Sequence, residues 1–366
     1  MKNLKVIISG GGTGGHIFPA LAIAKEIEKQ ACNVEFLFVG AQDRMEMEKI
    51  PNSGYNIIGL WISGLQRGID KRNLLFPFKF IHSIVRSRKI IKDFKPDLAI
   101  GTGGYASAPL LYVAAKIGVP CLIQEQNSYP GLANKLLARY VQKICVAYDK
   151  MDRFFPKKKL IFTGNPVRHD ILHFNEKKLQ AKNFFDIDSS IPTVLVIGGS
   201  LGALAINNAI GKNIDKLGSM GINLIWQTGV SYNYKAQQYI NKIDRKGMTA
   251  YSFIKDMGMA YSIADVIISR AGAIAISELC CVGKPVILVP SPNVAENHQF
   301  KNAQSLVNKN AALLVEDAYT NCKLVSTLEE LLNNESLKVT LSSNIKKIAV
   351  RDASNNIVKS ALDLVK

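Results

Sequence analysis

The sequence predicts an α/β fold built from two doubly wound domains in tandem. Short apolar runs of strand character alternate with longer helical patterns along the chain, which is typical of parallel sheets covered by helices on both faces. The alternation restarts once, after a polar, lysine-rich stretch at residues 163–188. A length of 366 residues also suits two domains, each large enough to bury a core of its own.

The first half of the chain begins with the segment that is most clearly predicted to be a strand. Leu4–Ser9 is short and apolar, as expected of a buried strand. Ala20–Gln30 follows with an amphipathic helical pattern. By the same criteria we expect strands at Val34–Val39, Ile57–Leu60, Leu98–Gly101, Pro120–Gln124 and Ile144–Ala147, with helices that include Lys79–Phe94 and Pro109–Ile117.

The second half repeats this layout without repeating its sequence. Thr193–Ile197 is an apolar strand that runs into a second glycine-rich loop and then a helix. Further strands are expected at Leu224–Gln227, Thr249–Phe253, Asp265–Ile268, Val286–Val289 and Ala312–Val315. The tail, Leu341–Lys366, has a helical pattern and no strand after it. Since open parallel sheets bind ligands at the carboxyl ends of their strands, two such domains facing a cleft suit two substrates.

A large excess of positive charge restricts the partners. The formal net charge is +17, and residues 1–163 carry 24 Lys and Arg against 12 Asp and Glu. Such an excess favours anionic partners, which are nucleic acid, anionic lipid or phosphorylated substrates. The sequence has neither a basic strand interleaved with aromatic residues nor a recognition helix, so nucleic acid is not expected. Six cysteines without a C-x-x-C pair indicate neither a zinc site nor a disulfide framework.

The first glycine cluster, residues 10–15, follows a strand and opens a helix. Glycines let a ligand approach the backbone, and free N–H groups at a helix N-terminus attract a pyrophosphate. The cluster also fits G-x-G-x-x-G, but a dinucleotide site needs an acid at the end of the second strand, and Glu35 lies at its start. We therefore expect a phosphate cradle and neither NAD nor FAD. His16, next in the chain, is either a packing or capping histidine or a general base for an acceptor hydroxyl.

The second glycine loop, Gly198–Ala203, contains G-x-S-x-G around Ser200, which is the pattern of a hydrolase nucleophile. A catalytic triad would have to recruit Asp256 or Asp265 together with His298. A second strand–glycine–helix unit explains the loop more simply as another phosphate cradle. We therefore expect the cradle.

Two acidic features remain. Asp186 and Asp188 form the D-x-D of some metal-dependent sugar transferases, but they precede a strand in a polar linker. We expect a solvated turn there and no metal. Glu278 follows a helix start of small residues, and it is either a surface acid or a bidentate acceptor for a ribose diol.

Taken in order, these and other motifs resemble one enzyme family. They are G-G-T-G-G-H at 11–16, G-T-G-G-Y at 101–105, E-Q-N at 125–127, G-L-A-N-K at 131–135, G-N-P-V-R at 164–168, G-G-S-L-G-A at 198–203, R-A-G-A at 270–273, S-E at 277–278 and H-Q-x-x-N-A at 298–303. The pattern covers nearly the whole chain and resembles the UDP-N-acetylglucosamine transferases of peptidoglycan synthesis, which convert lipid I to lipid II.

The resemblance implies a GT-B architecture, in which two Rossmann-like domains face a cleft and the last helix returns to the first domain. We therefore expect an acceptor domain at 1–165 plus 346–366, which also contacts the membrane, and a donor domain at 166–345. The implied substrates are UDP-N-acetylglucosamine (UDP-GlcNAc) and lipid I, with no cofactor and no metal. The implied location is the cytoplasmic face of the bacterial plasma membrane, as a peripheral protein.

The resemblance also implies roles for individual residues. The backbone at Phe253 and Ile254 would meet the uracil, and Glu278 would hold the ribose. The donor diphosphate would lie among Arg168, Ser200, Ala273 and Ile274. The sugar hydroxyls would contact Asn127 and Gln299. The acceptor would lie near Thr13, Gly14, Gly15, His16 and Tyr105. His16 is the expected catalytic base, and Glu125 is the next candidate.

An apolar run at Leu74–Ile81 is too short to span a membrane, and residues 65–95 carry nine Lys and Arg against two Asp and Glu. The run is either a buried helix start or an interfacial patch that binds an anionic membrane surface. Two other functions stay open: a transferase of the same fold that acts on another lipid such as diacylglycerol, and a basic protein that binds membrane surfaces without catalysis.

Overall fold

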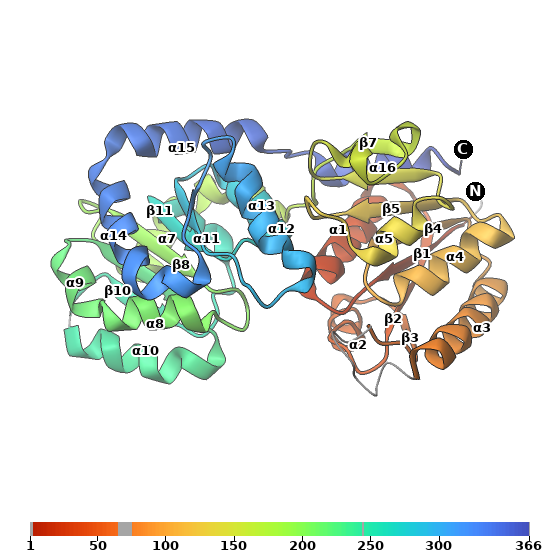
Figure 1. Cartoon of the computed structure of the whole chain (residues 1–366), viewed down its shortest axis with the longest axis horizontal. Helices are drawn as coiled ribbons and strands as arrows, with labels where there is room; N and C mark the ends of the chain where they lie inside the picture. Colours follow the sequence, from red (N-terminus) through yellow and green to blue (C-terminus); the bar gives the residue numbers. More distant parts are fainter. Residues whose placement is uncertain (1–2, 65–74, 244, 366) are drawn as a thin grey trace. The chain divides into compact units, whose positions relative to one another are not determined.

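The chain forms two compact units, which we describe separately (Figure 1). A computed structural model describes residues 3–64, 75–243 and 245–365. One unit comprises residues 1–167 and 352–366, and the other comprises residues 168–351. These limits lie a few residues beyond 165/166 and 345/346, the boundaries expected for the two domains. The second limit lies after helix α15 (Glu335–Ile348), which belongs to the second unit.

The first unit is built on a parallel sheet that has seven strands within the described residues. The strands are β1 (Leu4–Gly10), β2 (Val34–Ala41), β3 (Ile57–Leu60), β4 (Leu98–Gly103), β5 (Cys121–Glu125), β6 (Lys143–Val146) and β7 (Leu160–Phe162). Their order in the sheet is β3-β2-β1-β4-β5-β6-β7, so the direction of winding reverses between β1 and β4. Ligands of open α/β sheets bind outside the carboxyl ends of the strands at such a reversal.

Helices cover both faces of this sheet, because successive side chains of a strand point to opposite faces. Ile7 of β1 belongs to a core cluster with residues of α3 and α4, whereas its neighbours Val6 and Ile8 pack with α1 and α16. The helices are α1 (Gly14–Gln30), α2 (Glu46–Lys49), α3 (Phe76–Phe94), α4 (Ser107–Ile117), α5 (Leu132–Leu137) and α16 (Ala353–Leu362). The end of the chain therefore completes the core of its first half.

The second unit repeats this plan on a parallel sheet that has six strands in the part of the chain described. The strands are β8 (Thr193–Ile197), β9 (Asn223–Gln227), β10 (Met248–Tyr251), β11 (Val266–Ser269), β12 (Val286–Leu288) and β13 (Leu313–Leu314). Their order is β10-β9-β8-β11-β12-β13, and the winding reverses between β8 and β11.

The helices of the second unit lie between these strands and after them. They are α6 (His169–Leu172), α7 (Lys178–Phe185), α8 (Leu204–Lys212), α9 (Ile214–Ser219), α10 (Val230–Ile243), α11 (Met257–Ile263), α12 (Ala273–Val282), α13 (His298–Val307), α14 (Thr320–Asn333) and α15. Residues of α8, α10 and α14 share one core cluster with β8, β9 and β11. None of the described helices of the chain combines the length and hydropathy needed to cross a membrane.

The predicted α/β class with two doubly wound domains is confirmed, although some details differ from expectation. Strand β7 was not expected, because three residues at a sheet edge are too few to show a period. Helix α1 begins at Gly14, so the glycine cluster opens a helix as expected and its last two glycines belong to the first turn. The tail is two helices, with a break between Ile348 and Ala353 where the chain passes from one unit to the other.

Candidate functional site

The first half-site is the loop that joins β1 to α1. Thr13 has an extended backbone (φ −150°, ψ 157°) and precedes the first turn of α1, a helix of 17 residues. Thr13 and Gly15 are exposed, and Gly14 is half-buried. The unpaired N–H groups of a first helical turn, together with the helix dipole, make this position suitable for an anion. The structure therefore brings the predicted Thr13, Gly14 and Gly15 together at one helix N-terminus.

The loop after β4 lies against this first loop. The N–H of Gly11 donates to the carbonyl of Gly103 at 3.3 Å. Gly104 has φ +93°, and a Cβ atom at this position would lie 2.3 Å from the carbonyl oxygen of Gly11. The side chain of Tyr105 is exposed, and its ring lies beside Gly12. The two loops that flank the reversal of winding therefore pack backbone to backbone, with the predicted Tyr105 at their rim.

His16 has its ring held by this loop. Its Nδ1 lies 2.8 Å from the carbonyl oxygen of Gly11 and 3.4 Å from Oγ1 of Thr13. A carbonyl oxygen can only accept, so the hydrogen-bond pattern assigns the ring proton to Nδ1. Nε2 is then left as an acceptor, next to Gly103. This arrangement favours the general-base interpretation of His16 over the packing one.

The carboxylate of Glu125, the other predicted catalytic residue, accepts hydrogen bonds from the segment that follows β5. Its side chain is buried, and one carboxylate oxygen accepts from the backbone N–H (3.0 Å) and Nδ2 (3.2 Å) of Asn127. The other oxygen accepts from the N–H of Gly131 at 3.1 Å and from Nδ2 of Asn134 at 2.9 Å. Four donors on one buried carboxylate favour a structural role, in which Glu125 fixes the loop that carries Asn127.

Glu46 is a residue that the sequence reasoning missed. It follows β2, is fully buried, and accepts hydrogen bonds from the N–H groups of Gly12 (2.9 Å) and Ala41 (3.0 Å). A dinucleotide site would need an acid at the end of β2 to bind a ribose. Glu46 lies five residues after β2, at the start of α2, and supports the glycine loop instead.

The second half-site is the corresponding loop after β8. Gly199 and Gly202 have φ of +86° and +81°, and the N–H of Gly202 donates to the carbonyl of Gly199 at 3.1 Å. Ser200 is exposed at the tip of this turn. Glycine is needed at both positions, because a side chain strains this backbone conformation.

Gln227, at the end of β9, links this loop to the predicted uracil site. Its Nε2 donates to the carbonyl of Gly199 at 3.0 Å, and its Oε1 accepts from the N–H of Ile254 at 2.9 Å. Ile254 is buried, whereas Phe253 is half exposed. The structure thus joins the segments of Ser200 and Ile254 through one amide that the sequence reasoning did not single out. Because Ile254 is buried and its N–H is bonded to Gln227, the exposed side chain of this segment is that of Phe253.

The segment after β11 supplies the other predicted donor residues. Ala273 and Ile274 form the first turn of α12, a helix of 10 residues whose N-cap is Gly272. Glu278 lies about one turn further along, with its side chain buried. Its Oε1 accepts from Nε of Arg168 at 3.1 Å, and its Oε2 accepts from the hydroxyl of Tyr261 at 3.4 Å.

This ion pair shifts the pKa of both of its members. Burial raises the pKa of the Glu278 carboxyl above its ordinary value, although Arg168 acts in the opposite direction. Burial also acts to lower the pKa of Arg168, but the carboxylate of Glu278 outweighs it and the net shift is upward. Arg168 uses only Nε in the pair, so its two terminal nitrogens still have N–H groups to offer to an anion. Gln299 accepts from the N–H of Ser291 at 2.9 Å through Oε1, which leaves its amide NH₂ as a donor.

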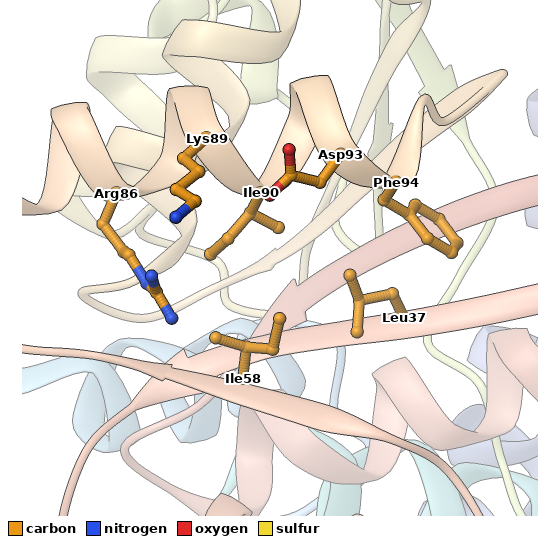
Figure 2. A pocket seen from close by; sticks show the side chains of 7 residues that line it. All are labelled: Leu37, Ile58, Arg86, Lys89, Ile90, Asp93 and Phe94. Atoms are coloured by element: carbon orange, nitrogen blue, oxygen red, sulfur yellow. The ribbon is translucent and has the colours of Figure 1, made fainter.

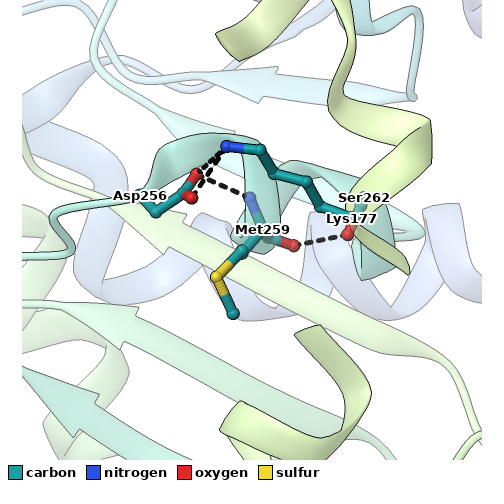
Figure 3. Close-up of polar contacts among 4 residues, drawn as sticks. All are labelled: Lys177, Asp256, Met259 and Ser262. Atoms are coloured by element: carbon teal, nitrogen blue, oxygen red, sulfur yellow. Dashed lines mark hydrogen bonds and ion pairs between the residues drawn. The ribbon is translucent and has the colours of Figure 1, made fainter. Parts of the chain in front are cut away.

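The alternative of a serine hydrolase is not supported, because both candidate aspartates are engaged elsewhere. Asp256 pairs with Lys177 at 2.7 Å and caps α11 by accepting from the N–H of Met259 at 3.2 Å (Figure 3). Asp265 lies at the start of β11, where it accepts from the N–H of Thr193 at 2.8 Å. Ser200 follows the opposite, carboxyl end of β8, so Asp265 is a full strand length away from it.

The D-x-D pair forms a surface turn. Asp186 has φ +48°, ends α7, and pairs with Lys246 at 2.9 Å. Asp188 accepts from the N–H (2.9 Å) and hydroxyl (2.7 Å) of Ser190, and these bonds lower the pKa of its carboxyl. These contacts agree with the expectation of a solvated turn.

A pocket of about 270 Å³ lies elsewhere in the first unit, between α3 and the strands β2 and β3 (Figure 2). Its lining combines apolar and charged side chains: Leu37, Ile58, Arg86, Lys89, Ile90, Asp93 and Phe94. Most of these residues belong to the second half of α3, away from the glycine loops. The pocket is therefore separate from the glycine loops that form the half-site of the first unit.

Comparisons with known proteins agree on one family. Residues 6–146 match the model of the glycosyltransferase family 28 N-terminal domain, and residues 193–357 match that of the family 28 C-terminal domain. Relatives from Cytophaga hutchinsonii and Flavobacterium psychrophilum are 52% and 48% identical over the whole chain and 98% and 99% of their own lengths. Both are named UDP-N-acetylglucosamine–N-acetylmuramyl-(pentapeptide) pyrophosphoryl-undecaprenol N-acetylglucosamine transferase.

Solved structures extend this result. The crystal structure of Acinetobacter baumannii MurG matches 99% of this chain and all of its own, with 26% identity and a TM-score of 0.79. A UDP-GlcNAc 2-epimerase from Neisseria meningitidis matches 99% of this chain and all of its own with a TM-score of 0.67, and at 16% identity it shows a common fold only.

The close packing of the two loops in the first unit leads to a stability prediction. Gly104→Ala adds a Cβ that collides with the backbone of Gly11, in addition to backbone strain at positive φ. Gly118 is the matched control, since it has φ +94° and nothing within 4 Å of an added Cβ. We expect Gly118→Ala to lower the free energy of unfolding by about 1–2 kcal/mol and Gly104→Ala by clearly more, as measured by urea denaturation. Equal losses would mean that the loops do not pack as described.

Proposed function

The chain belongs to glycosyltransferase family 28, and we propose that it transfers N-acetylglucosamine from UDP-GlcNAc to lipid I. The acceptor is the C4 hydroxyl of N-acetylmuramic acid in undecaprenyl-pyrophosphoryl-N-acetylmuramyl-peptide, and the product is lipid II. The full-length identity of about one half with relatives named for this reaction is the observation that carries the proposal.

The reaction is a direct displacement with inversion at the anomeric carbon. The bond from C1 of N-acetylglucosamine to the UDP oxygen breaks, the acceptor oxygen bonds to C1, and the hydroxyl proton passes to a base. The transition state resembles an oxocarbenium ion, and negative charge grows on the departing diphosphate. The enzyme therefore needs a cationic environment for UDP and a proton acceptor beside the hydroxyl.

The second unit offers the environment for UDP. The N-terminus of α12 at Ala273 and Ile274, the turn at Ser200, and the guanidinium of Arg168 each suit a diphosphate oxygen. Glu278 retains free lone pairs for the two ribose hydroxyls, and the segment of Phe253 and Ile254 would take the uracil. Gln299 would bind a sugar hydroxyl, as would Asn127 of the first unit. Arg168 and α12 can stabilise the leaving group, so we expect the chemistry to need no divalent ion.

The first unit offers the base and the acceptor site. Nε2 of His16 is the free acceptor of its ring, and the first turn of α1 with Thr13, Gly14 and Gly15 suits the acceptor pyrophosphate. Tyr105 stands at the rim of the same loops. We propose that the acceptor domain is the first unit, which comprises residues 1–167 and 352–366.

Transfer of labelled N-acetylglucosamine from UDP-GlcNAc to lipid I, with diacylglycerol as the parallel acceptor, tests the proposed reaction. We expect labelled lipid II and no labelled glycolipid. Labelling of diacylglycerol alone would favour a related transferase, and UDP-GlcNAc that is neither transferred nor hydrolysed would favour a binding protein.

Glu278→Ala should weaken donor binding selectively. Loss of a charged hydrogen-bond acceptor for the ribose corresponds to about 1.5–3 kcal/mol, or roughly ten- to a hundredfold in the donor KM. The acceptor KM should change far less, as measured in initial-rate assays with each substrate varied in turn. Tyr261→Phe is the control, because it removes a hydrogen bond to the same carboxylate without removing its charge. Equal changes in both KM values would contradict the assignment.

His16→Ala should reduce turnover while the fold survives, since the residue is only half-buried in the first turn of α1. Loss of a general base lowers kcat by about 10²–10⁴-fold. The comparison variant is His173→Ala, whose ring is exposed and pairs with Glu176 on the surface. A fully active His16→Ala enzyme with an unchanged circular dichroism spectrum would remove His16 as the base.

We further propose that helix α3 binds an anionic membrane surface. Leu75, Phe78, Ile81 and Val85 are 50–68% exposed, and their spacing puts the last three on one face of α3. Exposed basic residues follow on the same helix: Arg86, Arg88, Lys89 and Lys92. Leu74, at the start of the predicted patch, lies outside the described residues. The apolar side chains suit the headgroup boundary of a bilayer, and the cations suit anionic lipid.

The double variant Phe78→Glu, Ile81→Glu should weaken binding to vesicles of anionic phospholipid, as measured by co-sedimentation. The control Leu179→Glu, Val339→Glu adds the same charge at two exposed apolar positions of the second unit and should bind like the parent. High salt should weaken binding by the parent, because each cation near the surface contributes about 1 kcal/mol. Activity on a water-soluble acceptor analogue should change little. Undiminished vesicle binding by the α3 variant would place the membrane contact elsewhere.

A further inference from the structure

One peptide group connects the buried Glu46 to His16. The N–H of Gly12 donates to Oε2 of Glu46 at 2.9 Å. The carbonyl at the other end of the same peptide, that of Gly11, accepts from Nδ1 of His16 at 2.8 Å. Carboxylate, peptide and imidazole therefore form one continuous hydrogen-bonded chain.

The side chain of Glu46 is fully buried, and both of its carboxylate oxygens accept hydrogen bonds. Glu46 is the first residue of α2, its side chain has no exposed surface, and its second oxygen accepts from the N–H of Ala41 at 3.0 Å. The carboxyl group lies directly under the glycine loop, since a Cβ at Gly11 would lie 2.1 Å from its Oε1. A buried carboxylate costs free energy unless donors satisfy it, and here both donors are backbone N–H groups.

The electrostatic consequence follows from the polarity of the peptide group. A negative charge at the N–H end polarises the amide and makes its carbonyl oxygen a better acceptor, and hydrogen bonds in such a chain strengthen one another. The stronger acceptor favours the histidine tautomer with the proton on Nδ1 and fixes the plane of the ring. Nε2 is then held unprotonated and correctly oriented. Carboxylates that bond directly to a histidine have this effect in other sites, and here one peptide group intervenes.

We propose that Glu46 is a positioning residue that acts on His16 through the Gly11–Gly12 peptide and keeps Nε2 available as the proton acceptor. This inference rests on the proposed function, because His16 is the base of that reaction. It also has a structural part, the tautomer of His16, that can be tested without substrate.

The test uses the full-length protein labelled with ¹⁵N-histidine, at a pH where the imidazole is neutral. His16→Asn identifies the signals of His16. In the parent we expect a protonated Nδ1 and an unprotonated Nε2. In Glu46→Gln, which removes the charge and keeps the shape, the signals should shift towards a mixture of tautomers. Glu48→Gln is the matched control, because it removes the same charge from an exposed position of α2 and should leave His16 unchanged.

The kinetic part of the test follows kcat and both KM values of the same variants. Glu46→Gln should lower kcat by about tenfold, a fraction of the effect of losing the base itself, with the donor KM within twofold of the parent. Glu48→Gln should retain the parent kcat. If Glu46→Gln does not fold, Glu46→Asp carries the same test, since it keeps the charge but withdraws the carboxylate from Gly12.

Two results would overturn the proposal. One is a parent protein in which His16 carries its proton on Nε2. The other is a folded Glu46 variant with reduced stability but an unchanged tautomer and kcat, which would make Glu46 a purely structural anchor. Failure of the proposed transfer reaction gives a different pattern, because the tautomer of His16 would still respond to Glu46 while no turnover occurred with lipid I.

Discussion

The parallel order of each sheet is the constraint on which both half-sites depend. Parallel strands put all their carboxyl ends at one edge, and the loops that follow β1 and β4, or β8 and β11, flank the reversal of winding. A ligand can approach the backbone closely after β1, β4 and β8, because glycines predominate in these three loops. In the first unit the loops are so close that only hydrogen fits at Gly104. The glycines are thus required by the packing of the loops as well as by any ligand.

Buried carboxylates fix segments of the chain in both units. Glu46 binds the N–H groups of Gly12 and Ala41, Glu125 binds those of Asn127 and Gly131, and Glu278 binds Arg168. Each carboxylate has its donors, so its burial does not leave an unpaired charge. Loops held in this way need little reorganisation when a ligand binds, which is the condition under which fixed dipoles stabilise charge most effectively.

The sequence predicted most strands, both glycine loops and the position of His16, because these features depend on local composition. It did not predict β7, which is too short to show a pattern, nor the tertiary partners of the site residues. Arg168 and Glu278 were each singled out, yet their pairing across 110 positions is invisible in the sequence. Gln227 and Glu46 were missed for the same reason. The contact of Glu46 with Gly12 depends on α2 folding beneath the glycine loop, which only the tertiary structure reveals.

The two half-sites differ in the kind of charge they present, and the proposed reaction explains why. An acceptor hydroxyl must lose a proton as it attacks. The site that binds the acceptor therefore needs a neutral base with an unprotonated nitrogen whose position is fixed in advance. In the proposed reaction the first unit would meet this need with His16, whose ring is oriented by a carbonyl rather than by a charged group in direct contact. A departing diphosphate gains negative charge, so its half-site needs cations and N–H groups that are already in position. In the proposed reaction the second unit would meet this need with Arg168 and the start of α12. The pairing of Arg168 with Glu278 would fix the guanidinium before the donor binds. A carboxylate can contact the ribose of the donor directly, because the ribose hydroxyls are neutral. Beside either diphosphate a carboxylate would repel the ligand. The proposed roles follow this rule, since Glu46 would act on its loop through a peptide group and Glu278 would bind the donor ribose.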